Sequence, residues 1–293
     1  MMHIGAKDAV GGIVPGPFLL TKDDFKRITA MLYEDAGIYL TDAKAPLVYS
    51  RLAKRLRALG LENFRDYCTL VGSESGLDER QKMLAALTTN VTKFFREPHH
   101  FEHLKQNILL PKAESVRRGA RMRIWSAACS DGQEPYSIAM TVLSVLPDAA
   151  RLDVRILATD IDPNMIAAGK AGVYGEESAN AVPREMRAKW LHPIDDGKSK
   201  SWSVSSDVAE LVSFRELNLV GNWPIKGKFD AIFCRNVVIY FEEKTQAAIW
   251  TRFAEALVPE GRLYIGHSER VAGPATARFA GDGVTTYRLR GKE

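Results

Sequence analysis

The chain has 293 residues, of which 46% are hydrophobic and 26% are charged, and its net charge is +4. This composition is typical of a soluble globular protein, and the apolar runs are far too short to cross a bilayer. The N-terminus lacks a signal-peptide pattern, and the three cysteines form no CxxC pair, so we expect a cytoplasmic protein without disulfide bonds or a zinc knuckle. The small positive charge suits an acidic partner and does not require nucleic acid.

The first part of the chain predicts an all-helical domain over residues 18–90, after a loose tail over residues 1–17 that is rich in glycine and proline. Thr21 is followed by Asp23 and Asp24, which resembles a capping box, and Gly37 is expected to end the helix that begins there. Further helices are predicted over Asp42–Leu59, Asn63–Val71 and Leu77–Leu87.

A polar, β-branched segment, Thr88–Thr92, predicts a connection to a second domain over residues 91–293. There strands and helices alternate, which favours a Rossmann-like α/β fold with a mainly parallel sheet and helices on both faces. Ligands of such sheets bind at the carboxyl ends of the strands. The predicted strands are Arg123–Ala128, Val154–Thr159, Phe229–Cys234, Arg262–Ile265 and a final antiparallel Val284–Leu289; the predicted helices are Glu134–Leu146, one opening at Asp162-Pro163, and Lys244–Leu257.

Residues 173–211 interrupt this alternation, where a connection of about 2–6 residues is usual. The turn signal Asp195-Asp196-Gly197 lies beside the β-prone Ser201–Val204, so we predict a small inserted β subdomain. A disordered loop is the alternative, and Trp190 and Trp202 argue against it because disordered segments are poor in aromatic residues.

Small residues crowd the end of the first predicted strand, in Ser126–Pro135, and a helix follows. Such a turn lets a nucleotide-like ligand approach a helix N-terminus. The segment has one glycine, so it is neither the G-x-G-x-x-G dinucleotide motif nor a P-loop, and an ordinary strand-to-helix turn remains open.

Two aspartates follow the second predicted strand. A carboxylate there can accept two hydrogen bonds from a ribose diol, a role that we assign to Asp160. Asp162 precedes Pro163, which suits a helix N-cap. Together with the small-residue turn, Asp160 favours a cofactor that contains adenosine, without separating S-adenosylmethionine from NAD.

Five separated blocks resemble the chemotaxis receptor methyltransferase family, CheR, and the similarity runs from about residue 18 to 290. Gln133 stands where many members have glutamate. The blocks are Thr88–Glu97, Trp125–Ser137, Ala158–Asp162, Phe233–Phe241 and Gly266–Glu269. The resemblance implies an S-adenosylmethionine-dependent methyltransferase that esterifies receptor glutamates, releases S-adenosylhomocysteine and uses no metal.

The resemblance also implies roles for single residues. Glu134 would face the ammonium group of the cofactor, and Arg96 or Arg235 its carboxylate. Arg96 would orient the substrate carboxylate, and Tyr240 the substrate or the methyl group. A packing role is the alternative for Tyr240. The full set of implied cofactor residues is Asn90, Thr92, Arg96, Glu134, Asp160, Asn218, Leu219, Arg235 and Asn236.

The second predicted helix carries a run of basic residues. At 100° per residue, Lys44, Arg51, Lys54 and Arg55 share one face, beside an apolar stripe. A solvated surface is the simplest interpretation. The resemblance favours instead a docking face for the acidic cytoplasmic helices of chemotaxis receptors. A methyltransferase for small molecules and a non-catalytic sensor module remain the competing functions.

Overall fold

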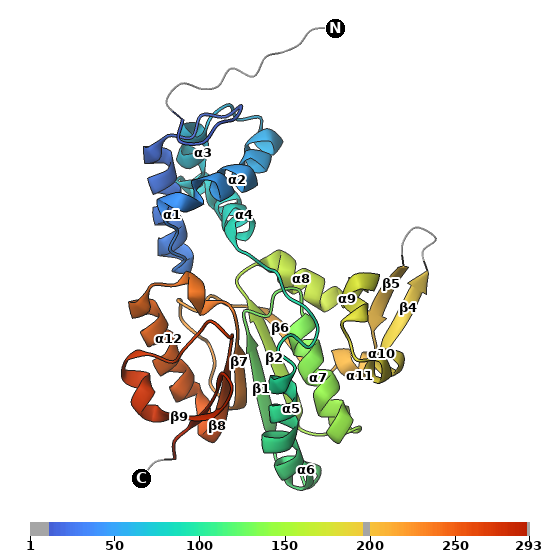
Figure 1. The fold of residues 1–293 in the computed structure, drawn as a ribbon. Helices are drawn as coiled ribbons and strands as arrows, with labels where there is room; N and C mark the ends of the chain where they lie inside the picture. The colour runs from blue at the N-terminus through green and yellow to red at the C-terminus, as the bar shows by residue number, and fades with distance from the viewer. Residues whose placement is uncertain (1–11, 196–199, 292–293) are drawn as a thin grey trace. The chain divides into compact units, whose positions relative to one another are not determined.

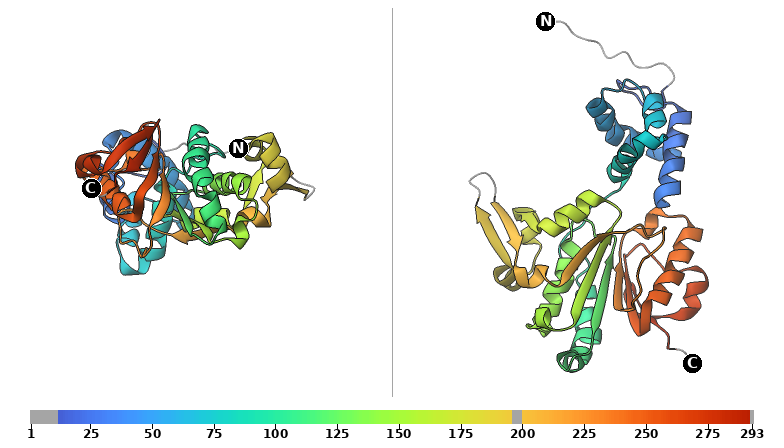
Figure 2. Two further views of the ribbon diagram at one scale, coloured as in Figure 1. Left: turned by 90° about the horizontal axis from the view of Figure 1, so that it is seen from below. Right: turned by 180° about the vertical axis from the view of Figure 1, so that it is seen from behind.

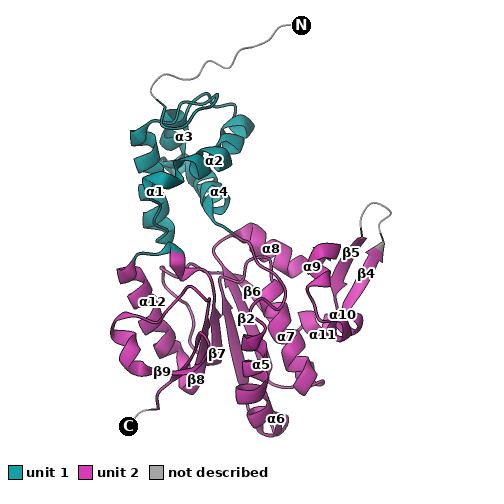
Figure 3. Ribbon diagram, viewed as in Figure 1, with its two compact units in different colours: residues 1–89, 240–242 teal, residues 90–239, 243–293 magenta. Residues whose placement is uncertain are grey.

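The computed structural model describes residues 12–195 and 200–291, which form two compact units (Figure 1, Figure 3). The first unit comprises residues up to Thr89 together with Tyr240–Glu242, and the second comprises the remainder. The start of the predicted tail, residues 1–11, lies outside the described residues. Among the described helices, none combines the length and the apolar character that a membrane span needs.

The first unit is all-helical, as predicted. α1 (Lys22–Ala36) begins at Thr21, whose hydroxyl accepts a hydrogen bond from the Asp24 N–H at 3.1 Å, and ends at Gly37 with φ 68°. One predicted boundary is wrong: a separate 3-10 turn over Asp42–Lys44 precedes α2, because Pro46 favours a helix start in its own first turn. The other helices are α2 (Ala45–Leu59), α3 (Phe64–Val71) and α4 (Leu77–Leu87).

A short segment from much later in the chain completes the first unit. Ile38 and Phe241 form an antiparallel bridge, and the Tyr39 N–H donates to the Tyr240 carbonyl at 2.9 Å. The Tyr33 hydroxyl donates to Glu242 Oε2 at 2.8 Å. The helical unit is therefore built from two stretches of chain that are distant in sequence.

The second unit contains a seven-stranded sheet with the order β6-β2-β1-β7-β8-β10-β9. Its first five strands in this order are parallel, and β10 runs antiparallel to both neighbours. The mainly parallel sheet and the antiparallel final strand were predicted, whereas β9 was not. The strands are β1 (Met122–Ala127), β2 (Val154–Asp160), β6 (Val212–Glu216), β7 (Phe229–Cys234), β8 (Leu257–Ile265), β9 (Phe279–Gly283) and β10 (Thr286–Leu289).

Helices cover both faces of this sheet, as Figure 2 shows in two further views. Ile124 of β1 belongs to the core that α5, α6 and α7 share, while the ring of its neighbour Trp125 lies 5.3 Å from Phe253 of α12. A π-helical turn, Lys105–Leu109, joins α5 and α6, and neither this turn nor α6 was predicted. The helices are α5 (His99–Leu104), α6 (Leu110–Arg117), α7 (Gln133–Val145), α8 (Pro163–Ala171) and α12 (Glu243–Ala256).

The order of the strands places a topological switch point at β1. The chain runs outward from β1 through β2 to β6, and then returns to the other side of β1 as β7. In open α/β sheets, ligands bind beyond the carboxyl ends of the strands at this point. The loops that follow β1, β2 and β7 therefore frame the candidate site.

The insert between α8 and β6 forms the predicted small β subdomain, and its antiparallel sheet has the order β3-β5-β4. It also contains two helices before β4 that were not predicted, and part of the predicted turn, residues 196–197, lies outside the described residues. Its elements are β3 (Val173–Gly175), α9 (Glu176–Asn180), α10 (Arg184–Trp190), β4 (Leu191–Asp195), β5 (Lys200–Val204) and α11 (Ser206–Ala209).

Candidate active site

The loop after β1 makes a tight turn before α7. Ala128, Ser130 and Gly132 have φ values of 59°, 52° and 93°. A Cβ atom on Gly132 would lie 3.0 Å from the Gly169 Cα and equally close to the Phe214 ring, so only glycine fits without a shift. The turn thus holds backbone close to the N-terminus of α7, where N–H groups and the helix dipole favour an anionic ligand.

Asp160, at the end of β2, ties this turn in place. Its carboxylate is 5% exposed and accepts the Ser130 N–H at 2.8 Å on Oδ2 and the Asp162 N–H at 3.0 Å on Oδ1. Burial raises the pKa of Asp160 above its ordinary value, an effect that these two N–H groups oppose. Each oxygen keeps a further lone pair, so the carboxylate can still accept hydroxyl groups of a ligand.

Asp162 has the capping role that was predicted for it. Its Oδ1 accepts the Asn164 N–H at 2.9 Å at the start of α8. Its Oδ2 accepts from the Asn90 side-chain amide at 3.0 Å, and the Asn90 carbonyl accepts from the Ser130 hydroxyl at 2.7 Å. Asn90 therefore lies against the same turn as Asp160, while Thr92 is half-buried two residues further along.

Two side chains of α7 anchor the segment that contains Asn90 and Arg96. Gln133 Oε1 accepts the Phe94 N–H at 3.0 Å, and the Ser137 hydroxyl accepts the Phe95 N–H at 3.0 Å. Because α7 follows β1 directly, these bonds fix residues 94–96 at the carboxyl edge of the sheet. Neither anchoring role was predicted; the sequence marked Gln133 only as a departure from the family pattern.

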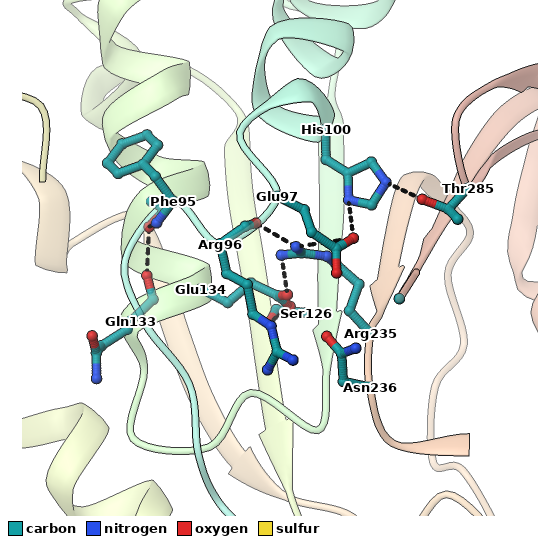
Figure 4. Close-up of polar contacts among 12 residues, drawn as sticks. Phe95, Arg96, Glu97, His100, Ser126, Gln133, Glu134, Arg235, Asn236 and Thr285 are labelled. Carbon is teal, nitrogen blue, oxygen red and sulfur yellow. Dashed lines mark hydrogen bonds and ion pairs between the residues drawn. The ribbon is translucent and has the colours of Figure 1, made fainter. Parts of the chain in front are cut away.

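A buried ion pair occupies the switch point (Figure 4). Arg235, which follows β7, donates from Nη1 to Glu134 Oε2 at 3.0 Å and from Nη2 to the Arg96 carbonyl. The other oxygen of Glu134 accepts from the Ser126 hydroxyl of β1 at 2.7 Å. Three of the predicted site residues, Arg96, Glu134 and Arg235, are thus brought together, and Glu134 and Arg235 pair with each other.

Two polar atoms of this cluster are buried without a hydrogen-bond partner, namely Arg235 Nε and Asn236 Oδ1. The first is a donor and the second is an acceptor. Unpaired polar groups of this kind are costly inside a protein, and ligand sites are a common reason for them. A ligand with both a carboxylate and an ammonium group would satisfy both atoms.

Glu269 holds the loop after β7 in shape. Its Oε1 accepts the N–H groups of Val237 and Val238 at 2.9 Å each, and its Oε2 accepts those of Asn236 at 2.9 Å and Gly266 at 2.5 Å. Burial raises the pKa of Glu269, and the four N–H groups oppose that change by favouring the anion. Gly266 is needed here, because a Cβ on it would lie 2.4 Å from the Asn236 side chain.

Other predicted side chains have their contacts outside this network, and Arg96 joins the network only through its backbone carbonyl. Asn218 and the buried Leu219 follow β6; the Asn218 side chain accepts the Val220 N–H at 2.9 Å, and the Leu219 carbonyl accepts from Arg252 at 2.9 Å. Arg96 directs its guanidinium to the Val91 carbonyl at 3.2 Å. Tyr240 is half-buried and belongs to the helical unit.

The thiols near the site are not nucleophiles. Burial raises the pKa of Cys129 and of Cys234 well above the usual range, so both remain protonated at neutral pH. The site therefore offers positioned charges and hydrogen-bonding groups, which suit the binding and alignment of a ligand that contains a ribose and an amino acid.

The two units match two family models. Residues 23–88 match "CheR methyltransferase, all-alpha domain", and residues 90–287 match "CheR methyltransferase, SAM binding domain". A "Probable chemotaxis protein methyltransferase" of Rhizobium etli is 54% identical over 262 residues, which cover 89% of this chain and 98% of that protein. The "Chemotaxis protein methyltransferase" of Escherichia coli is 40% identical over 272 residues, covering 92% of each. "Chemotaxis protein methyltransferase 2" of Pseudomonas aeruginosa is 41% identical over 253 residues, covering 86% of this chain and 88% of that protein.

Proposed function

The chain belongs to the CheR methyltransferase family and contains its S-adenosylmethionine-binding domain, and on this premise we propose that it esterifies glutamate side chains of chemotaxis receptors. The observation that carries the proposal is the match of both domains, helical and cofactor-binding, to relatives named chemotaxis methyltransferases. A chain that kept only the cofactor domain would support methyl transfer without indicating a receptor.

The residues present fit the cofactor. The buried donor Arg235 Nε and the buried acceptor Asn236 Oδ1 suit its carboxylate and its ammonium group, and Asp160 suits the ribose. Asn90 and Thr92 would border the ribose side, and Asn218 and Leu219 the adenine. These assignments remain proposals, as does the orienting role of Arg96 and Tyr240.

The proposed reaction needs no general base. A glutamate side chain has an ordinary pKa of about 4.3, so it is an anion at neutral pH. The bound cofactor supplies a methyl group activated by its sulfonium. In such a transfer one carboxylate oxygen would bond to the methyl carbon as the carbon–sulfur bond breaks, and the electron pair of that bond would stay on sulfur. The residues of this chain would align the two reactants, and alignment can contribute about 7–11 kcal/mol.

Incubation with methyl-labelled S-adenosylmethionine and receptor-rich membranes tests this function. We expect label on a membrane protein, released as methanol by mild base, because carboxylate methyl esters are base-labile. Membranes that lack chemotaxis receptors are the control and should stay unlabelled. Label on a small molecule, or no transfer together with normal cofactor binding, would contradict the proposal.

Asp160 provides a prediction about the cofactor. Asp160→Ala should weaken S-adenosylmethionine binding by about 1.5–3 kcal/mol, the range for hydrogen bonds to a charged group, as measured by calorimetry. Asp153→Ala is the matched control. Asp153 lies directly before β2, at the end of the strand away from Asp160, and it pairs with Arg123 at 2.5 Å. Since Asp160 also holds two backbone N–H groups, thermal melting must show that the variant is folded. Unchanged affinity in a folded Asp160→Ala protein would remove this residue from the site.

The proposed docking face is smaller than the sequence suggested, because two of its four basic residues bind other groups of the helical unit. Arg51 donates to the carbonyls of Leu87 at 2.9 Å and Thr88 at 2.6 Å, near the end of α4. Arg55 binds both oxygens of the buried Glu79 at 2.8 and 2.6 Å. These two arginines stabilise the packing of α2 against α4, and only Lys44 and Lys54 of the predicted face are exposed.

Reversal of those two lysines tests docking. The double variant Lys44→Glu, Lys54→Glu should slow receptor methylation about tenfold or more at low ionic strength, because steering by charge changes association rates by about 10–10³. The effect should shrink with added salt, and cofactor affinity should not change. Lys22→Glu, Lys26→Glu on α1 makes the same change in net charge on another helix and serves as the control. Equal rates for the two double variants at low salt would mean that the α2 face does not dock.

A further inference from the structure

A second polar cluster lies beside the ion pair, on the segment that leads into α5. His100 is fully buried, and its Nε2 lies 2.9 Å from the Thr285 hydroxyl and 3.3 Å from the Val284 carbonyl. A carbonyl can only accept a hydrogen bond, so Nε2 carries the ring proton. Nδ1 therefore presents a lone pair.

That lone pair faces another acceptor. His100 Nδ1 lies 3.6 Å from Glu97 Oε2, and both atoms are buried without a hydrogen-bond partner (Figure 4). Two acceptors that face each other repel unless something positive lies between them. Two ligands of one Zn²⁺ ion, each at about 2.0–2.2 Å from it, can be at most about 4.4 Å apart. The observed separation fits a shared ion.

A third ligand lies next to this pair. His99, the exposed first residue of α5, has its ring centroid 4.2 Å from that of His100. Glu97, His99 and His100 each have one possible ligand atom, a carboxylate oxygen or a ring nitrogen, and these three atoms lie within 4.8 Å of one another. Because His99 is exposed at the start of α5, its ring could turn toward the shared ion.

We propose that Glu97, His99 and His100 form a binding site for a divalent transition-metal ion, with Zn²⁺ as the best match. Two imidazole nitrogens and one carboxylate oxygen suit Zn²⁺, whereas Mg²⁺ prefers oxygen ligands. The hydrogen bonds from Nε2 of His100 are the outer support that metal-binding histidines commonly have. Three protein ligands leave one coordination position for water.

The position of this site couples it to methyl transfer. Arg235 Nη2 lies 3.5 Å from the same Glu97 oxygen, and Arg235 also holds Glu134. A dication bound to Glu97 would repel the guanidinium and withdraw a carboxylate from it. Bound Zn²⁺ should therefore disturb the Arg235–Glu134 pair, and the site is inhibitory.

The test titrates Zn²⁺ into metal-stripped protein without an affinity tag, in competition with a chromophoric chelator. We expect one equivalent to bind, and His99→Ala to weaken binding by at least the roughly 10–100-fold that loss of a supporting partner costs. His192→Ala is the matched control, since His192 is an exposed histidine on β4, and it should bind Zn²⁺ as the unaltered protein does. Mg²⁺ at the same concentration should not compete.

The activity assay provides an independent readout. Zn²⁺ should inhibit methyl transfer by the unaltered protein, while His99→Ala should keep its basal activity and lose the inhibition. Equal Zn²⁺ affinity in His99→Ala and the unaltered protein would overturn the site. The absence of stoichiometric Zn²⁺ binding would also overturn the site. In that case a proton shared by Glu97 and His100 explains why their side chains lie so close together. Both binding results are independent of the proposed receptor substrate.

Discussion

Glu269→Gln is expected to lower the free energy of unfolding of the cofactor-binding unit by about 3–5 kcal/mol, because the amide leaves buried backbone N–H groups without an acceptor. The glutamine keeps one acceptor oxygen, and its NH₂ group then faces two of the four backbone N–H groups that the carboxylate now binds. Each unsatisfied N–H costs about 1–3 kcal/mol. At about 2–4 °C per kcal/mol for a unit of this size, the melting temperature should fall by about 6–20 °C.

Glu255→Gln is the matched control for this variant. The Glu255 side chain is 65% exposed and lies 3.9 Å from Arg278, so its neutralisation should change stability by no more than about 0.5 kcal/mol. Glu269→Gln should also lower cofactor affinity, because the loop that Glu269 holds carries Asn236. Glu255→Gln should leave cofactor affinity unchanged. If the melting temperatures of Glu269→Gln and Glu255→Gln differ by less than about 2 °C, the four hydrogen bonds contribute little to stability. For a unit of this size, that difference corresponds to about 0.5–1 kcal/mol.

Tyr240→Phe is expected to reduce turnover about 10²–10³-fold while cofactor affinity stays nearly constant. If the hydroxyl aligns the reacting groups, its loss should cost about 2.7–4 kcal/mol in the transition state, by analogy with oxyanion donors. The fold should survive, because the bond that anchors Tyr240 runs from the Tyr39 N–H to its backbone carbonyl and does not involve the ring. Steady-state kinetics and calorimetry together separate turnover from binding.

Tyr240→Ala and Tyr39→Phe complete this experiment. If the ring contacts the sulfonium, Tyr240→Phe should keep activity and Tyr240→Ala should lose cofactor affinity, since cation–π contact needs only the ring face. Tyr39 is 55% exposed in the same unit, so removal of its hydroxyl is a control without expected effect. Normal turnover and affinity in both Tyr240 variants would assign it a packing role.

Local signals in the sequence predicted local structure well. The cap at Asp162 was identified from the adjacent Pro163, and the helix end at Gly37 from the residue type alone, because both depend on neighbours within one turn. β9 was missed because its five residues include two glycines, and its strand conformation depends on pairing with β10. α6 was missed because the π-helical turn before it, Lys105–Leu109, breaks the helical period.

The candidate site was predicted less completely, because it depends on contacts between residues that are distant in sequence. Glu269 was noted within a family block, yet its partner loop lies 31–33 residues earlier, and no local pattern indicates that contact. Arg51 and Arg55 were correctly placed on one face of α2. A helical wheel does not show what packs against that face, and α4 covers part of it. Partner choice across the fold is thus the information that single-sequence patterns lack.

The bridge between Ile38 and Phe241 has a consequence for synthesis on the ribosome. The helices of the first unit emerge early, but the segment Tyr240–Glu242 that completes it is made about 150 residues later, which takes roughly 8–30 s at about 5–20 residues per second. During that interval the nascent helical unit exposes Ile38 and the backbone N–H of Tyr39 without their native partners. A fragment that ends at Thr89 would remain in that unfinished state, so the helical unit cannot be excised by truncation without loss of stability.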